Sequence, residues 1–145
     1  MQIVIGADHR GYDLKNKLKE YLTQKGYEVI DVGAKEYDAL DDNPVFGEAV
    51  SKAVLEDKSR LGIVICGSGI GISIAANRTK GIYCGLAFDE KQLLSGKQHD
   101  HLNVISLPAD YISFEKATAL VDIFLSTKNL EEEKYIRRRD MLDTI

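Results

Sequence analysis

The sequence predicts an α/β fold, a three-layer α/β/α Rossmann-like domain with a five-stranded parallel sheet. Short apolar runs alternate with longer amphipathic segments, and the run Ile63-Val64-Ile65 is unbroken, as in a strand buried on both faces. Such alternation requires crossover connections, which make the strands parallel and place helices on both faces. In sheets of this kind, ligands bind at the carboxyl ends of the strands.

Each element follows from a local pattern. We expect strands at residues 2–6, 28–32, 61–66, 82–87 and 103–107, and helices at residues 12–25, 44–56, 71–78, 89–96, 113–125 and 131–142. Leu14, Leu18 and Leu22 form the apolar stripe of the first helix, and Gly26 ends it. Pro44 opens the second helix. The polar, acidic residues 33–43 are expected to form a loop.

Length, charge and cysteine usage narrow the class of protein. A chain of 145 residues is enough for one core, so we expect a single domain over residues 1–145. The net charge of −4 is unlike that of a general nucleic-acid binder. No apolar run approaches the ~20 residues of a membrane span, and the first residues do not resemble a secretory signal. Cys66 and Cys84 lie in separate apolar runs, so we expect buried, reduced thiols in a cytoplasmic protein.

The strongest local signal is the run Cys66-Gly67-Ser68-Gly69-Ile70-Gly71, which ends a buried strand and opens a helix. N–H groups in such a turn converge on one point and favour an anion. The positive end of the helix also favours a thiolate, so Cys66 is a candidate general base beside an oxyanion hole. The structural alternative is a core cysteine followed by a tight turn. The run matches neither the dinucleotide fingerprint nor the P-loop, because Ile72 breaks the glycine spacing and no lysine follows.

Two further groups of polar residues are candidates. Asp8 and His9 follow the first strand, where Asp8 could bind a substrate hydroxyl and His9 an anionic group; alternatively, Asp8 only caps the next helical segment. In the segment His99-Asp100-His101, a histidine is a natural proton shuttle. These three residues could also ligate a metal, but their spacing does not complete a site, and we expect none.

The last predicted helix is highly charged. It carries Lys134, Arg137, Arg138 and Arg139 after a run of three glutamates at 131–133. Opposite charges four residues apart stabilise a solvated helix face, which is the simplest explanation of this pattern. The alternative is an anion site, because arginine suits phosphate oxygens.

Taken together, these motifs resemble the type B ribose-5-phosphate isomerases, a family that also includes galactose-6-phosphate isomerase subunits. The resemblance covers essentially the whole chain and rests on four segments: Gly6-Ala7-Asp8-His9-x-Gly11, Gly26-Tyr27-Glu28-Val29-Ile30-Asp31-x-Gly33, the block from Ile65 through Cys66 to Asn77, and His99 with Asn103-Val104. It implies a Rossmann-like homodimer that uses neither a metal nor another cofactor. It also implies interconversion of D-ribose 5-phosphate and D-ribulose 5-phosphate through an enediolate.

The resemblance also implies a role for each candidate. Cys66 would move the proton between C1 and C2, and His99 would open the furanose ring. Ser68 stands where the family has Ser or Thr beside the base. The remaining residues would bind the substrate: Asp8 and His9; Gly67, Gly69, Ile70 and Gly71 through their amides; and Asp100, Lys134, Arg137 and Arg138. The C-terminal helix, about 130–145, would pack on the dimer partner, so that Lys134 and Arg138 reach the neighbour's pocket.

Three positions depart from the family's pattern. Asn43 replaces a frequent tyrosine, Asp100 a frequent asparagine, and Asp110 an arginine that often follows the fifth strand. The proton-transfer residues are therefore intact, whereas the phosphate-binding set is depleted. Either Lys134, Arg138 and His9 suffice, or the substrate is another sugar or sugar phosphate, such as a hexose 6-phosphate. A hypothesis from a different class is a non-catalytic binder of a small anion.

Overall fold

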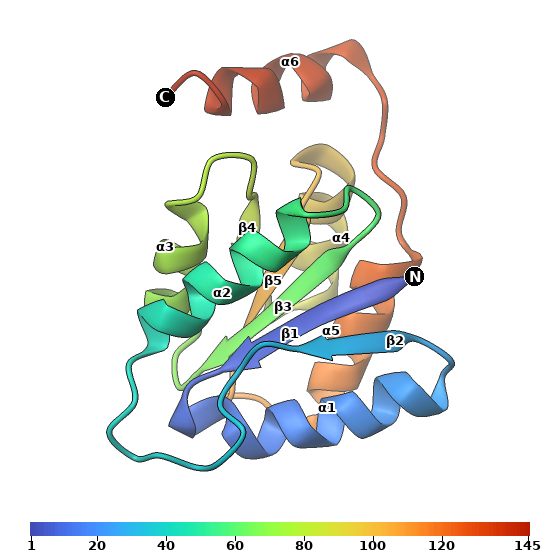
Figure 1. Ribbon diagram of the computed structural model, residues 1–145. Coiled ribbons are helices and arrows are strands. Elements are labelled where there is room, and N and C mark those ends of the chain that lie inside the picture. Colours follow the sequence, from blue (N-terminus) through green and yellow to red (C-terminus); the bar gives the residue numbers. More distant parts are fainter.

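The expected strands form one parallel five-stranded sheet in the order β2-β1-β3-β5-β4. The computed structural model describes all 145 residues (Figure 1). The strands are β1 (Gln2–Ala7), β2 (Glu28–Asp31), β3 (Leu61–Cys66), β4 (Cys84–Leu86) and β5 (Val104–Pro108). Because β5 returns between β3 and β4, the three longest strands are neighbours at the centre of the sheet.

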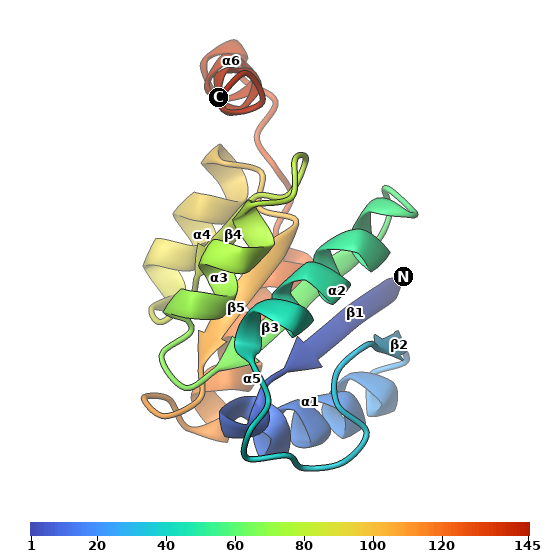
Figure 2. The ribbon, with the colours of Figure 1, turned by 60° about the vertical axis from the view of Figure 1, so that its left-hand side comes forward.

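Helices cover both faces of the sheet and make the three expected layers (Figures 1 and 2). They are the short 3-10 helix η1 (His9–Gly11), α1 (Tyr12–Gln24), α2 (Asn43–Leu55), α3 (Ile70–Asn77), α4 (Glu90–His99), α5 (Phe114–Ser126) and α6 (Glu133–Leu142). Buried side chains of α1, α4 and α5 pack on one face, and those of α2 and α3 pack on the other. The predicted fold class is therefore confirmed.

The central strand β3 shows why the unbroken apolar run was informative. Its successive side chains alternate between the two faces of the sheet. Ile63 and Ile65 belong to the core under α1, α4 and α5, whereas Val64 belongs to the core under α2 and α3. All three are completely buried. An alternating polar pattern would have left one of these two cores without its central side chains.

Some boundaries differ from the expected ones. The fourth helix was expected to end at Gly96, but α4 continues to His99. A Cβ on Gly96 would lie 3.1 Å from Cδ1 of Leu102, so this glycine allows close packing rather than ending the helix. The expected strand at 82–87 is shorter, and the last helix begins at Glu133 rather than near residue 131.

Helix α6 lies apart from the three layers in both views, on the side of the sheet where the strands begin (Figures 1 and 2). None of its residues is buried. Arg139 Nη1 donates to Nδ1 of the buried His101 at 2.9 Å, and the Tyr83 hydroxyl donates to Asp143 just after the helix. These two polar contacts help to attach the C-terminal segment to the rest of the chain. No helix is long and apolar enough to cross a membrane.

Candidate active site

The carboxyl ends of β1, β3 and β5 surround a cavity of about 410 Å³. Its lining comprises Asp8, Arg10, Asn43, Cys66, Gly67, Ser68, Gly71, Asp110 and Tyr111. Asp8 and Arg10 follow β1, Cys66 ends β3, and Asp110 and Tyr111 follow β5. The cavity therefore lies at the edge where a parallel sheet of this kind binds ligands.

Cys66 and its glycine turn have the geometry of an anion site. Gly69 takes the left-handed conformation, with φ of 73°, and its N–H donates to Cys66 Sγ at 3.2 Å. Ser68 Oγ accepts from the N–H of Ile70 at 3.2 Å. Gly69, at the N-cap position of α3, has no side chain, so apart from the Ser68–Ile70 bond the N–H groups at the helix start, including that of Gly71, have no side-chain cap. A buried thiol and uncapped helix N–H groups thus lie in one turn.

Asp8 has the structural role that the sequence left open. Its Oδ1 accepts from the N–H groups of Arg10 and Gly11, at 3.0 and 3.2 Å, which caps η1. Only 5% of Asp8 is exposed, and this burial raises the pKa of its carboxyl, against the lowering effect of the two N–H groups. Because Asp8 also lines the cavity beside Cys66, capping does not exclude contact with a substrate.

The structure pairs His9 with a residue that the sequence analysis missed. Asp41 Oδ1 accepts from the backbone N–H of His9 at 2.9 Å and lies 2.8 Å from His9 Nδ1. The Asp41 side chain is 10% exposed, and its Oδ2 has no hydrogen-bond partner. Asn43 Oδ1, beside Gly71, is also buried without a partner. The acidic composition of residues 33–43 could have pointed to Asp41 and Asn43. The contacts of Asp41 with the loop after β1 join segments far apart in the sequence, so only the fold shows them.

Arg10 is a second residue that the sequence analysis did not select. Its guanidinium forms a close ion pair with Asp110, which raises the pKa of Arg10. A Cβ on Gly67 would lie 2.7 Å from Arg10 Nε and 2.6 Å from Asp110 Oδ2. The absence of a side chain at position 67 therefore makes room for this pair immediately beside Cys66.

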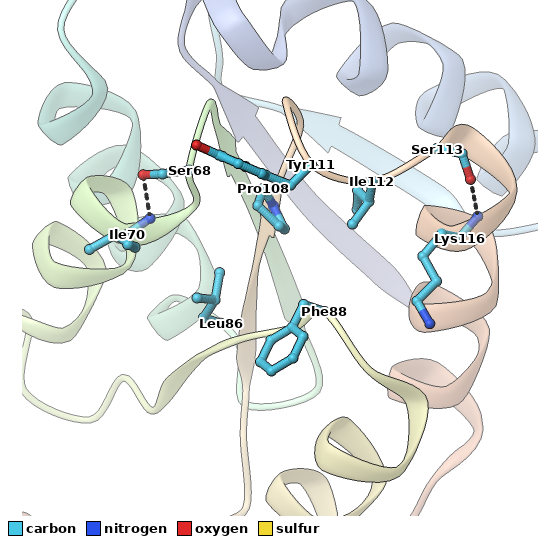
Figure 3. A pocket seen from close by; sticks show the side chains of 9 residues that line it. All are labelled: Ser68, Ile70, Leu86, Phe88, Pro108, Tyr111, Ile112, Ser113 and Lys116. Carbon is cyan, nitrogen blue, oxygen red and sulfur yellow. Dashed lines mark hydrogen bonds between the residues drawn. The ribbon is translucent and has the colours of Figure 1, made fainter.

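An apolar hollow of about 620 Å³ adjoins the cavity and shares Ser68 and Tyr111 with it (Figure 3). Ile70, Phe88 and Tyr111 line it and are 53%, 55% and 78% exposed. Lys116, on α5, lies at one end and forms an ion pair with Glu90 at 2.5 Å. Exposed apolar side chains are thus concentrated next to the Cys66 turn.

His99 lies near the amino-terminal ends of the strands, opposite the cavity at their carboxyl ends. It is the last residue of α4 rather than part of a loop, and its ring stacks on Tyr135 of α6 at a centroid distance of 4.4 Å. Asn103, only four residues later, bonds to the N–H of Gly62 near the beginning of β3, whereas Cys66 is the last residue of β3. The length of the sheet therefore separates Cys66 from His99 within one chain.

The other predicted C-terminal residues accompany His99. Asp100 follows it, and Lys134, Arg137 and Arg138 are exposed on α6. Lys134 lies 3.5 Å from Glu132 and over the ring of Tyr135. Arg139, by contrast, uses its guanidinium to bind His101 and Asp140. The chain therefore brings Cys66, Ser68 and Asp8 into one cavity, with His9 next to Asp8 but outside its lining, and does not bring the C-terminal cations to them.

Two groups of side chains contain residue types that can ligate a metal ion. Asp8, His9 and Asp41 offer three ligand atoms within 4.8 Å of one another, but the His9–Asp41 hydrogen bond already uses one face of that group. Both ring nitrogens of His101 bond within the chain, to Arg139 and to the carbonyl of Leu130. The segment His99-Asp100-His101 therefore does not form a ligand set. Cys84, the second cysteine, is free and buried, and burial raises its pKa to about 12.

A cavity at the carboxyl ends of the strands is where α/β proteins of this kind bind their ligands, and comparison with known proteins defines the family. The sequence profile of the Ribose/Galactose Isomerase family matches residues 3–142. This chain belongs to that family and is an aldose–ketose isomerase by family.

Individual relatives agree with this assignment. The chain is 39% identical over 142 residues to ribose-5-phosphate isomerase B of Mycobacterium tuberculosis, which covers 98% of this chain and 88% of the relative. It is 37% identical over 129 residues to a galactose-6-phosphate isomerase subunit of Clostridium acetobutylicum, covering 88% and 73%. The structure of ribose-5-phosphate isomerase B from Mycoplasma genitalium with bound ribulose 5-phosphate superposes with a TM-score of 0.93, at 36% identity, over 99% of this chain and 94% of that one.

Proposed function

We propose that this protein interconverts D-ribose 5-phosphate and D-ribulose 5-phosphate through an enediolate, without a metal or other cofactor. The observation that carries the proposal is the Cys66 thiol beside uncapped N–H groups in one strand-edge cavity. Relatives named ribose-5-phosphate isomerase B, one of them with ribulose 5-phosphate bound, support the choice of substrate.

In this mechanism, Cys66 acts as the base. Starting from the open-chain aldose, its thiolate removes the C2 proton, and negative charge develops on the carbonyl oxygen O1. The hydroxyl proton of O2 passes to O1 within the enediolate, and the thiol returns the carbon-bound proton to C1, which leaves the ketose carbonyl at C2 and regenerates the thiolate. A sugar α-proton is weakly acidic, so the developing oxyanion needs preorganised donors, each typically contributing ~3 kcal/mol. The N–H groups of the turn from Gly67 to Gly71 are suited to this task, and Ser68 lies beside the base.

His99 would open the furanose ring before this step, and it can do so only from another molecule. Cys66 and His99 lie at opposite edges of the sheet within one chain. We therefore propose a homodimer in which the partner's α4 end and α6 approach the cavity. Asp100, Lys134, Arg137 and Arg138 of the same edge would then act in trans. The exposed apolar residues Ile70, Phe88 and Tyr111 beside the cavity suit burial in such an interface.

The base is tested with a coupled assay on ribose 5-phosphate. Cys66→Ala should abolish turnover, whereas Cys84→Ala, which removes the other buried thiol, should keep it. A Cys66→Ala protein with undiminished turnover would exclude the mechanism.

The shared site is tested by mixing two inactive variants. Cys66→Ala and His99→Ala subunits, unfolded and refolded together, should recover about a quarter of the wild-type sites, because half of the random dimers combine one intact Cys66 with one intact His99. Light scattering checks that the protein is dimeric. A strict monomer, or a mixture that recovers no activity while both parents refold, would contradict the shared site.

A second candidate is isomerisation of another sugar or sugar phosphate. Asp110 places a carboxylate in the cavity, and one relative is named a galactose-6-phosphate isomerase subunit. A panel of pentoses and hexoses, each with and without phosphate, separates the two, since a strict preference for ribose 5-phosphate removes this candidate. A protein that turns over no sugar but binds inorganic phosphate would instead be the non-catalytic anion binder.

A further inference from the structure

Arg10 is the one basic residue among the nine that line the 410 Å³ cavity, where Asp8 and Asp110 supply two carboxylates. A sugar phosphate brings at least one negative charge into this space. We propose that Arg10 binds the phosphate of the substrate, with Asp110 positioning its guanidinium. This inference rests on the proposed function and adds a specificity-determining residue to it.

The placement of Arg10 follows from the short helix that carries it. Asp8 caps η1 by accepting from the N–H of Arg10 at 3.0 Å, which fixes the backbone from which the side chain departs. The stem then lies against Gly67, where an added Cβ would come within 2.9 Å of Arg10 Cδ. The cation is therefore held next to the residue that follows Cys66, at the solvent-exposed side of the cavity.

Arg10 retains donors for a ligand. A guanidinium has five N–H donors, and the close contact with Asp110 Oδ2 is made through Nη2. The Arg10 side chain is still 57% exposed. An exposed ion pair by itself contributes little to stability, so stability alone gives no reason to hold this pair in the cavity. A planar guanidinium can bind two phosphate oxygens at once, and this function would explain why the pair lies in the cavity.

Asp110 orients the Arg10 guanidinium and also limits the directions from which a phosphate can approach it. Its carboxylate holds one edge of the guanidinium, and it would repel a phosphate that approached from its own side. A phosphate bound to Arg10 must therefore use the edge that faces away from Asp110. Moving the guanidinium to the other member of the pair, with Arg10→Ala and Asp110→Arg together, would keep one cation in the same cavity and remove the carboxylate.

The test compares three proteins with wild type: Arg10→Ala, the double variant Arg10→Ala/Asp110→Arg, and the control Lys25→Ala. Lys25 also forms a half-exposed ion pair, with Asp122, but at the far end of α1. KM and kcat are measured for ribose 5-phosphate and for unphosphorylated ribose, and binding of inorganic phosphate is followed separately by phosphorus NMR.

We expect Arg10→Ala to raise KM for ribose 5-phosphate roughly 10- to 100-fold, which corresponds to the loss of one charged hydrogen bond. Turnover of ribose, which has no phosphate, should be unchanged. Arg10→Ala should also weaken phosphate binding by a similar factor. The double variant should recover most of both, and Lys25→Ala should alter neither.

Two results overturn the inference: phosphate binding and KM for ribose 5-phosphate within twofold of wild type in Arg10→Ala, or an equal loss with ribose and ribose 5-phosphate, which would indicate a merely structural role. The NMR measurement needs no turnover. An inactive wild type whose phosphate binding disappears in Arg10→Ala would therefore contradict the proposed isomerase but support the phosphate site, whereas a wild type that binds no phosphate overturns the site itself.

Discussion

Replacing Gly69 by alanine tests the link between the Cys66 turn and catalysis. Gly69 has φ of 73°, and a Cβ there would lie 2.6 Å from Leu86 Cδ1, 3.1 Å from Ser106 Oγ and 3.2 Å from the backbone of Leu107. The left-handed conformation costs about 1–2 kcal/mol for a residue with a side chain, and forced displacement of packed neighbours costs about 1–3 kcal/mol more. We expect a loss of about 2–5 kcal/mol in the free energy of unfolding.

Gly26 provides the matched control. It also has positive φ, at 92°, but an added Cβ would meet nothing within 4 Å. Gly26→Ala should therefore cost only the conformational part, about 1–2 kcal/mol, and should not affect catalysis because it lies just after α1.

Urea unfolding gives the two stabilities, and the coupled isomerase assay gives the activities under conditions where both variants are folded. Because the N–H of Gly69 donates to Cys66 Sγ, a shifted turn should reduce kcat at least about 10-fold in Gly69→Ala. The reasoning is refuted if Gly69→Ala is no less stable than Gly26→Ala and retains full kcat.

Three further predictions concern burial, orientation and packing. Burial lowers the pKa of Lys97 from 10.5 to about 8, so wild type should gain stability between pH 8 and 10.5, where only the unfolded chain holds the proton. Urea unfolding of Lys97→Met should lack this gain; an identical pH dependence in both proteins would contradict it. Asp41→Asn should raise KM about 10-fold through a misoriented His9, with little change in melting temperature. An unchanged KM would show that Asp41 does not position the ring. Phe124→Ala should cost about 3–5 kcal/mol, because the side chain is completely buried, and a loss below 1 kcal/mol in urea would count against the packing described.

Much of the fold was predictable because its signals are local. The apolar run in β3 predicted burial on both faces, and the Cys66 turn predicted a strand that passes into a helix through glycines. The structure confirms both. The predicted end of the fourth helix, at Gly96, was wrong. This glycine permits close packing by Leu102, and local propensity cannot show such a contact.

The sequence by itself determined the three-layer architecture, the Cys66 turn and the edge of the sheet on which a ligand binds, because each depends on neighbouring residues and on the rules of parallel sheets. Only the tertiary structure decided which loops meet there. It paired His9 with Asp41 and Arg10 with Asp110, across separations in sequence that no local pattern encodes. It also placed His99 at the edge opposite Cys66, since a helix that crosses back along the sheet carries its last residue away from the edge where it began.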